Sequence, residues 1–298
     1  MIDRLIERIE ALGAPIVVGL DPTLEMIPER IVKSSSLESM SAALYEFNCE
    51  IIDAIYDLIP AVKPQIAMYE RYGISGLQAY VDTAKYARSK GLLVIGDIKR
   101  SDISSTATAY AAHIGGTMAE GKVVYPWPED AITLNPYLGS DSITPFLDVC
   151  GEQEKGIFLL VKTSNPGSGD LQDLPLVSGK LVYEHIADLV SDWGKNYVGK
   201  YGYSKVGAVV GATFPEQGRK LREQLPHTFF LVPGYGAQGG SGKDLRGFFD
   251  KNGLGCIVNS SRGIIAAWKK EQSSDGYNVG EAARKAVIAM RDDLQGAF

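Results

Sequence analysis

The sequence of 298 residues is poor in cysteine and histidine. Its three cysteines form no CxxC pair, and its three histidines lie far apart along the chain. This disfavours a disulfide framework, a zinc site and a histidine-based catalytic triad. We expect the cysteines to be buried free thiols in a reducing compartment.

Long apolar runs are also missing. None approaches the roughly 18 residues that a membrane-spanning helix needs. The first residues, Met1 to Glu7, have the pattern of an amphipathic helix and not that of a signal peptide. The sequence therefore predicts a cytoplasmic protein without a membrane partner.

Positive charge is not in excess. The chain carries 30 Lys and Arg against 36 Asp and Glu, a formal net charge of -6. No basic stripe of useful length occurs, which argues against a general nucleic-acid or membrane-surface role. A small anionic substrate stays possible, because it needs only a few local cations.

Eight short apolar segments alternate with helix-length amphipathic stretches. Strand and helix alternation of this kind indicates parallel strands with right-handed crossovers, and eight units in just under 300 residues favour a (β/α)₈ TIM barrel, one domain over residues 1–298. The alternative is an open doubly wound sheet. It is disfavoured because no GxGxxG follows the first strand. The expected strands are Ile16–Leu20, Ala61–Ile66, Leu92–Ile98, Ala131–Leu134, Gly156–Val161, Val206–Gly211, Thr228–Val232 and Gly255–Val258, and the helices are 37–58, 76–90, 103–119, 141–150, 179–199, 215–225, 243–251 and 279–293.

Two connections look long for such a barrel. One runs from Gly115 to Asp130, and the other covers 179–204. We expect both to be elaborations of the surface.

A row of charge follows the third expected strand. The apolar run from Leu92 to Ile95 leads directly into Asp97, Lys99 and Asp102. Asp97 and Lys99 are two residues apart, so at a strand end both side chains point to one face. The plain alternative is a solvated rim of the sheet.

The other expected strand ends favour a functional site over a solvated rim. In a (β/α)₈ barrel the chemistry lies at the carboxyl ends of the strands. Nearly every such end here supplies a polar group or a glycine turn, and the opposite strand ends show no such enrichment. Residues that stand at these ends without an assigned role are Asn135, Lys162, Thr163 and Thr213.

The last two strand ends have the features of a phosphate site. Residues 234–242 hold five glycines in nine positions, which lets backbone N–H groups approach an anion. Gln238 lies in this loop and can donate an amide N–H. Arg262 follows the eighth strand just before a helix, where its guanidinium can clamp a phosphate.

These residues together resemble a known family. Asp97 to Ile103 is similar to the DxKxxDI signature of orotidine 5'-phosphate decarboxylases, and the resemblance covers essentially the whole chain. Further positions match the family in order: Asp21, Lys63, Ser164 within Thr163-Ser164-Asn165-Pro166-Gly167, Gln238 and Arg262. The long inter-strand segments and the Thr-Ser-Asn-Pro-Gly turn resemble the longer bacterial (type 2) subgroup.

The resemblance implies decarboxylation of orotidine 5'-monophosphate (OMP) to uridine 5'-monophosphate (UMP), with no metal and no organic cofactor. It assigns the proton donor to Lys99 and places it in a charge network with Lys63, Asp97 and Asp102. A fixed cation beside C6 suits this chemistry, because the electron pair left at C6 cannot delocalise into the ring.

The remaining roles come from the same resemblance. Asp21 and Lys63 are expected to bind the ribose, Ser164 the pyrimidine amide edge, and Gln238 and Arg262 the phosphate. Family members are typically homodimers, and Asp102 is expected to serve the site of the partner subunit.

Two other functions stay open from the residues alone. A metal-dependent sugar-phosphate decarboxylase or aldolase shares DxKxxD, but its Mg²⁺ site needs a further carboxylate where strand two offers Lys63. A non-catalytic phosphonucleotide-binding protein is disfavoured because a pure binder has no need of a lysine between carboxylates.

Overall fold

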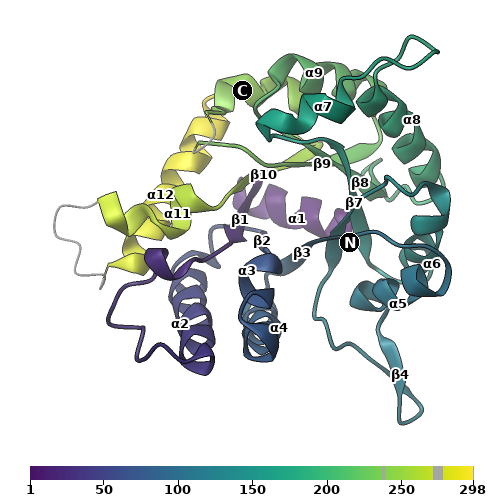
Figure 1. Ribbon diagram of the computed structural model, residues 1–298. Helices are drawn as coiled ribbons and strands as arrows, with labels where there is room; N and C mark the ends of the chain where they lie inside the picture. Colours follow the sequence, from purple (N-terminus) through teal and green to yellow (C-terminus); the bar gives the residue numbers. More distant parts are fainter. Residues whose placement is uncertain (237–238, 271–277, 298) are drawn as a thin grey trace.

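The computed structural model describes residues 1–236, 239–270 and 278–297. Eight parallel strands close into a barrel in the order β1-β10-β9-β8-β7-β6-β3-β2, with helices around it (Figure 1). This confirms the predicted (β/α)₈ barrel. The barrel strands are β1 Ile16–Leu20, β2 Ala61–Pro64, β3 Leu93–Arg100, β6 Ala131–Leu134, β7 Gly156–Lys162, β8 Ser204–Val210, β9 Thr228–Val232 and β10 Cys256–Ser260.

Helices of very different length connect the strands. The longer ones are α1 Ile2–Leu12, α2 Leu37–Ile55, α4 Gly73–Ser89, α5 Ser104–Gly115, α6 Thr144–Glu152, α8 Val182–Gly194, α9 Pro215–Gln224 and α12 Val279–Gln295. Single turns of α-helix are α3 Ala67–Glu70, α7 Gly169–Gln172, α10 Gly242–Leu245 and α11 Arg262–Ile265. Short 3₁₀ turns are η1 Leu24–Met26, η2 Ser140–Ser142, η3 Pro166–Ser168, η4 Arg246–Phe248 and η5 Ala267–Lys270.

Two apolar layers hold the barrel together. The outer layer lies between the strands and the surrounding helices, and it includes Phe47, Tyr80 and Phe146. The inner layer fills the barrel itself with alternate strand residues, such as Phe158 and Phe229. Helix α1 packs its apolar face on this inner layer. The helix thereby closes one end of the barrel.

The connection from Gly115 to Asp130 differs from the expected continuous helix over 103–119. Helix α5 ends at Gly115, and β4 Thr117–Ala119 pairs with β5 Lys122–Val124 in an antiparallel hairpin. Gly116 has a φ of 74°, and a Cβ there would lie 2.6 Å from the Val124 carbonyl oxygen. A glycine is therefore needed where the helix turns into the hairpin, which projects from the barrel (Figure 1).

From the sequence we expected no enrichment of polar groups at the amino ends of the strands. The structure differs from this expectation at β6. Glu129 and Asp130 precede β6 directly, and both are buried. The Glu129 carboxylate contacts the Tyr80 hydroxyl and lies 2.9 Å from Nδ1 of His113, while Asp130 accepts the N–H of Val94 at 3.0 Å. These carboxylates tie helices α4 and α5 and strand β3 to β6.

None of the described helices is both long enough and apolar enough to cross a bilayer.

Candidate active site

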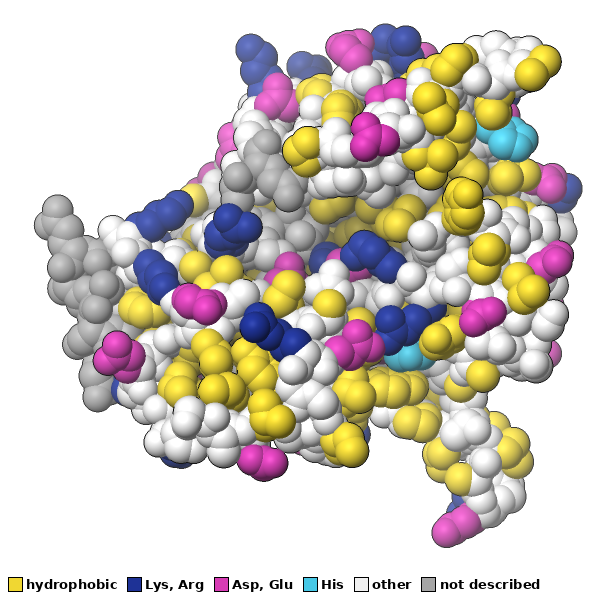
Figure 2. Space-filling view, viewed as in Figure 1, with side chains coloured by type: hydrophobic (Ala, Val, Ile, Leu, Met, Phe, Trp, Pro, Cys, Tyr) yellow, Lys and Arg dark blue, Asp and Glu magenta, His cyan; other side chains and the backbone are white. Residues whose placement is uncertain are grey.

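Two adjoining cavities open at the carboxyl ends of the strands. The first, of about 310 Å³, is lined by Asp21, Thr23, Met26, Lys63, Met68, Asp97, Pro233, Gly234, Tyr235, Asn259, Ser261 and Arg262. The second, of about 490 Å³, is lined by Lys63, Asp97, Lys99, Thr133, Leu160, Thr163, Ser164, Asn165, Gly167, Ser168, Leu171, Gln172, Val209, Leu231 and Pro233. Lys63, Asp97 and Pro233 belong to both, so the cavities meet at the Lys63–Asp97 pair. Figure 2 shows this face hollowed, with charged side chains in and around the hollow.

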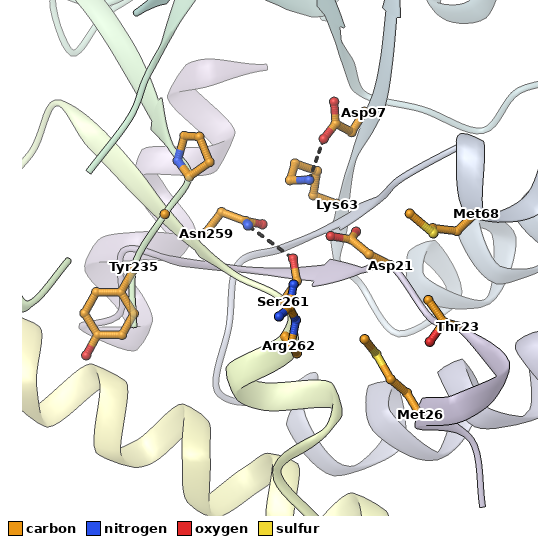
Figure 3. A pocket seen from close by; sticks show the side chains of 12 residues that line it. Asp21, Thr23, Met26, Lys63, Met68, Asp97, Tyr235, Asn259, Ser261 and Arg262 are labelled. Carbon is orange, nitrogen blue, oxygen red and sulfur yellow. Dashed lines mark hydrogen bonds and ion pairs between the residues drawn. The ribbon is translucent and has the colours of Figure 1, made fainter. Parts of the chain in front are cut away.

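Asp97 is the centre of the site. Its side chain is only 10% exposed, and Lys63 Nζ donates to Oδ2 at 2.7 Å (Figure 3). Lys99 Nζ binds the other carboxylate oxygen, Oδ1. Burial alone would raise the pKa of Asp97, but the charges of Lys63 and Lys99 outweigh burial and hold this pKa well below its usual range.

Lys63 is the buried cation of the pair. Its side chain is 5% exposed, against 44% for Lys99. Burial acts to lower the pKa of Lys63, but the charges of Asp97 and Asp21 outweigh it and raise this pKa. Lys63 is therefore an ammonium held in a fixed position, whereas the more exposed Lys99 lines the second cavity.

The backbone of β3 brings Lys99 back over Asp97. Lys99 has a φ of 48°, and the pairing of β3 with β6 shifts register between Gly96 and Arg100. A residue other than glycine is strained in this left-handed conformation, which persists only where the surrounding structure holds it. Here the Lys99 N–H donates to Oγ1 of Thr133 at 3.1 Å, and the same hydroxyl donates to Oδ1 of Asp97 at 2.9 Å.

Thr133 was not among the residues singled out from the sequence. It is 1% exposed on β6 and fixes both the carboxylate and the backbone of the lysine. In the run Ala131–Leu134 a β-branched residue looks like an ordinary strand residue. Only its place beside Asp97 in the closed barrel reveals its role.

Asp21 and Arg262 both line the first cavity. Asp21 follows β1, and its Oδ1 is buried without a hydrogen-bond partner among the described residues. Arg262 is the first residue of α11, at the end of β10. Figure 3 shows both beside Ser261, with Lys63 and Asp97 beyond Asp21.

Ser164 lines the second cavity. Gly211 allows it to approach β8, because a Cβ at Gly211 would lie 2.8 Å from the Ser164 backbone. Thr213 supports the turn by donating to the Ser164 carbonyl oxygen at 3.2 Å. The floor of this cavity is apolar, formed by Leu160, Val209 and Leu231.

Two predicted residues are not part of this cluster. Asp102 lines neither cavity, and its Oδ1 accepts the N–H of Ile103 at 2.8 Å. Gln238 lies outside the described residues. No group of three or more His, Cys, Asp or Glu side chains in the described ranges has the geometry of a metal site.

A barrel with an arginine at its last strand end and a lysine–carboxylate–lysine cluster on its floor defines a class of enzyme that binds phosphorylated ligands at the carboxyl ends of the strands. The model of the orotidine 5'-phosphate decarboxylase / HUMPS family matches residues 14–277. The chain belongs to this family.

Named relatives agree with this assignment. The chain is 48% identical over 291 residues to orotidine 5'-phosphate decarboxylase of Rhodopirellula baltica, covering 95% of both chains. It is 46% identical over 297 residues to the enzyme of that name from Clostridium perfringens, covering 99% of this chain and 98% of the relative. A crystal structure of a putative orotidine 5'-phosphate decarboxylase from Streptomyces avermitilis matches with a TM-score of 0.81 and 30% identity, over 99% of this chain and 94% of the other.

The coupling of Asp97 to Lys63 leads to a prediction about pH. The depressed pKa means that ionised Asp97 stabilises the fold above the unfolded-state pKa of about 3.9, and that this stabilisation is lost as the pH falls toward the folded-state value. Lys63→Met removes the closest buried cation, so the folded-state pKa of Asp97 should rise toward the unfolded-state value. The stability that Asp97 loses in acid is set by the difference between these two pKa values, so the acid loss of stability should become smaller in the variant. Urea unfolding between pH 2 and 7 measures this change.

Lys33→Met is the control for this measurement. Lys33 is 79% exposed, and its ion pair with Glu46 is long, at 4.0 Å. Its stability profile should follow that of the unmodified protein. An unchanged acid limb in Lys63→Met would contradict the assignment of Lys63 as the group that keeps Asp97 ionised.

Proposed function

We propose that this protein decarboxylates OMP to UMP, with Lys99 as the proton donor to C6. The observation that carries the proposal is the Lys63–Asp97–Lys99 cluster at the junction of the two cavities. The second cavity offers Ser164 above an apolar floor, which suits a planar pyrimidine. The first offers Asp21 for the ribose and Arg262 for the phosphate.

The reaction replaces one bond at C6 with another. The C6–carboxylate bond breaks, CO₂ leaves, and its electron pair stays at C6 in an sp² orbital outside the ring's π system. The Lys99 ammonium stabilises this charge and then transfers a proton to C6. Asp97 lies near the substrate carboxylate, so the repulsion between the two anions is relieved as CO₂ departs.

The position of Lys63 favours this reaction over a metal-dependent sugar-phosphate reaction in the same barrel. Lys63 is a buried cation hydrogen-bonded to Asp97, where a Mg²⁺ site would need a further oxygen ligand. We infer that Lys63, Asp97 and Lys99 carry out the reaction without a metal. The Thr163–Gly167 turn and the long connections further support membership of the longer bacterial subgroup.

We also propose a homodimer with shared sites. Asp102 is three residues from Lys99 but lines neither cavity. Large apolar side chains are exposed on the loops after β3 and β6: Ile103 is 47%, Tyr137 74% and Leu138 46% exposed. A second copy covering this rim would bury them and bring its Asp102 to the site.

Lys99→Ala should abolish turnover, because it removes both the cation beside C6 and the proton. We expect kcat to fall at least about 10⁴-fold, while the circular dichroism spectrum stays unchanged. The decrease in orotate absorbance measures the decarboxylation rate. The same assay in EDTA should leave the unmodified enzyme fully active. Substantial decarboxylation by Lys99→Ala would remove this residue from the mechanism.

Arg262→Ala should act through the phosphate. Loss of a charged clamp predicts a fall in kcat/KM of about 100-fold on OMP. On orotidine, which lacks the phosphate, the effect should be small. Equal losses on both substrates would refute the phosphate assignment.

A mixture of two inactive variants tests the shared site. In a heterodimer of Asp102→Ala with Lys99→Ala, one site contains both native residues, so activity should return. The measurement is the decarboxylation rate of heterodimers purified with two affinity tags. If verified heterodimers stay inactive, Asp102 serves the site of its own chain or none.

A further inference from the structure

A buried lysine lies directly behind the second cavity. Lys162 is the last residue of β7 and is 0% exposed, but it does not line the cavity. The pairing of β7 with β8 shifts register between Leu160 and Lys162. Leu160 belongs to the cavity floor, whereas Lys162 contacts residues beyond the barrel wall.

The Lys162 ammonium has two hydrogen-bonding and two aromatic partners. It donates to Oδ1 of Asp173 at 2.7 Å and lies 3.4 Å from Oγ of Ser168. It also sits over the ring of Phe214, 4.5 Å from the centroid, and 5.5 Å from that of Tyr183. These contacts hold the amine in place without any ligand, so Lys162 is not itself a candidate for binding or proton transfer.

The partners of Lys162 bracket a short segment of chain. Lys162 and Asp173 stand at its two ends, and Ser168 is in its middle. Gln172 closes the same segment a second time: its Oε1 accepts the Thr163 N–H at 3.0 Å and its Nε2 donates to Thr163 Oγ1 at 2.8 Å. Figure 1 shows the segment, with α7, leaving the end of β7 and crossing the rim of the barrel.

This segment forms most of one wall of the second cavity. Seven of the residues that line it lie between Lys162 and Asp173, namely Thr163, Ser164, Asn165, Gly167, Ser168, Leu171 and Gln172. In contrast, no residue of the segment lines the first cavity. A change in its conformation would therefore alter the second cavity and leave Asp21 and Arg262 in place.

We propose that Lys162 is a positioning residue that, through its ion pair with Asp173, sets the shape of the wall that recognises the nucleobase. A buried ammonium is costly without its counterion, so the chain keeps Asp173 next to it, and the loop between them has little freedom. The ion pair thereby contributes to base affinity without touching the base. This inference rests on the proposed function, which puts the pyrimidine in the second cavity.

The test compares ligands with and without a base. Asp173→Asn should weaken the binding of UMP at least about tenfold by calorimetry, while binding of ribose 5-phosphate changes by less than about twofold. Asp170→Asn is the matched control, since Asp170 is an exposed carboxylate on the same short helix α7. It should bind both ligands like the unmodified protein.

A second variant keeps the test decisive if Asp173→Asn is unstable. Lys162→Met with Asp173→Leu removes both charges, so it leaves no buried ion unpaired. We expect it to fold and still to lose UMP affinity selectively. An equal loss for UMP and ribose 5-phosphate, or no loss for UMP, would overturn the proposal.

The outcome is separable from the proposed function. If the unmodified protein does not decarboxylate OMP, the proposed function fails whatever the variants bind. If it does, and both variants keep the UMP affinity of the Asp170→Asn control, only the role of Lys162 is wrong.

Discussion

A buried carboxylate held ionised between two lysines is the constraint on which this site depends. Placing Asp97 inside the barrel without cations would cost several kcal/mol, and the protein would protonate it instead. Lys63 is itself buried, so it needs Asp97 as much as Asp97 needs it. Replacing Asp97 alone would leave the buried Lys63 without its hydrogen-bonded counterion, and replacing Lys63 alone would leave Asp97 with only the more exposed Lys99. The pair is therefore the least replaceable part of the site.

Around this ion pair, the floor of the barrel is divided into a polar half and an apolar half. Strands β2, β3 and β6 supply the polar side chains Lys63, Asp97 and Thr133, whereas β7, β8 and β9 supply Leu160, Val209 and Leu231. A nucleotide has the same division, with a charged end and a flat, less polar base. In the proposed mode of binding, the bond that breaks lies where the two halves meet.

Much of this arrangement could be predicted from the sequence, because it depends on local patterns. Alternating apolar segments predict the strands, and the spacing of Asp97 and Lys99 places both on one face. The roles of Thr133 and Lys162 could not be predicted. Thr133 acts through residues from a neighbouring strand, and the contacts of Lys162 depend on a register shift that no local pattern indicates.

The same limit explains the differences from the expected secondary structure. An amphipathic pattern continues past Gly115, but the positive φ of Gly116 ends the helix and starts the hairpin. Buried Glu129 also looked unremarkable in sequence, since its partners His113 and Tyr80 come from two different helices.

The charge cluster also restricts how the proposed reaction can proceed. Substrate brings a carboxylate close to Asp97, and the product of bond cleavage carries the same negative charge at C6 instead. The total charge does not change in that step, so a cation stabilises the transition state only if it is closer to C6 than to the departing carboxylate. The direction of the Lys99 side chain therefore matters more than its charge. That direction is set by Asp97 on the ammonium and by Thr133 on the backbone N–H, each acting on a residue in a strained conformation. In this structure the placement of one lysine depends on two neighbouring strands, β3 and β6.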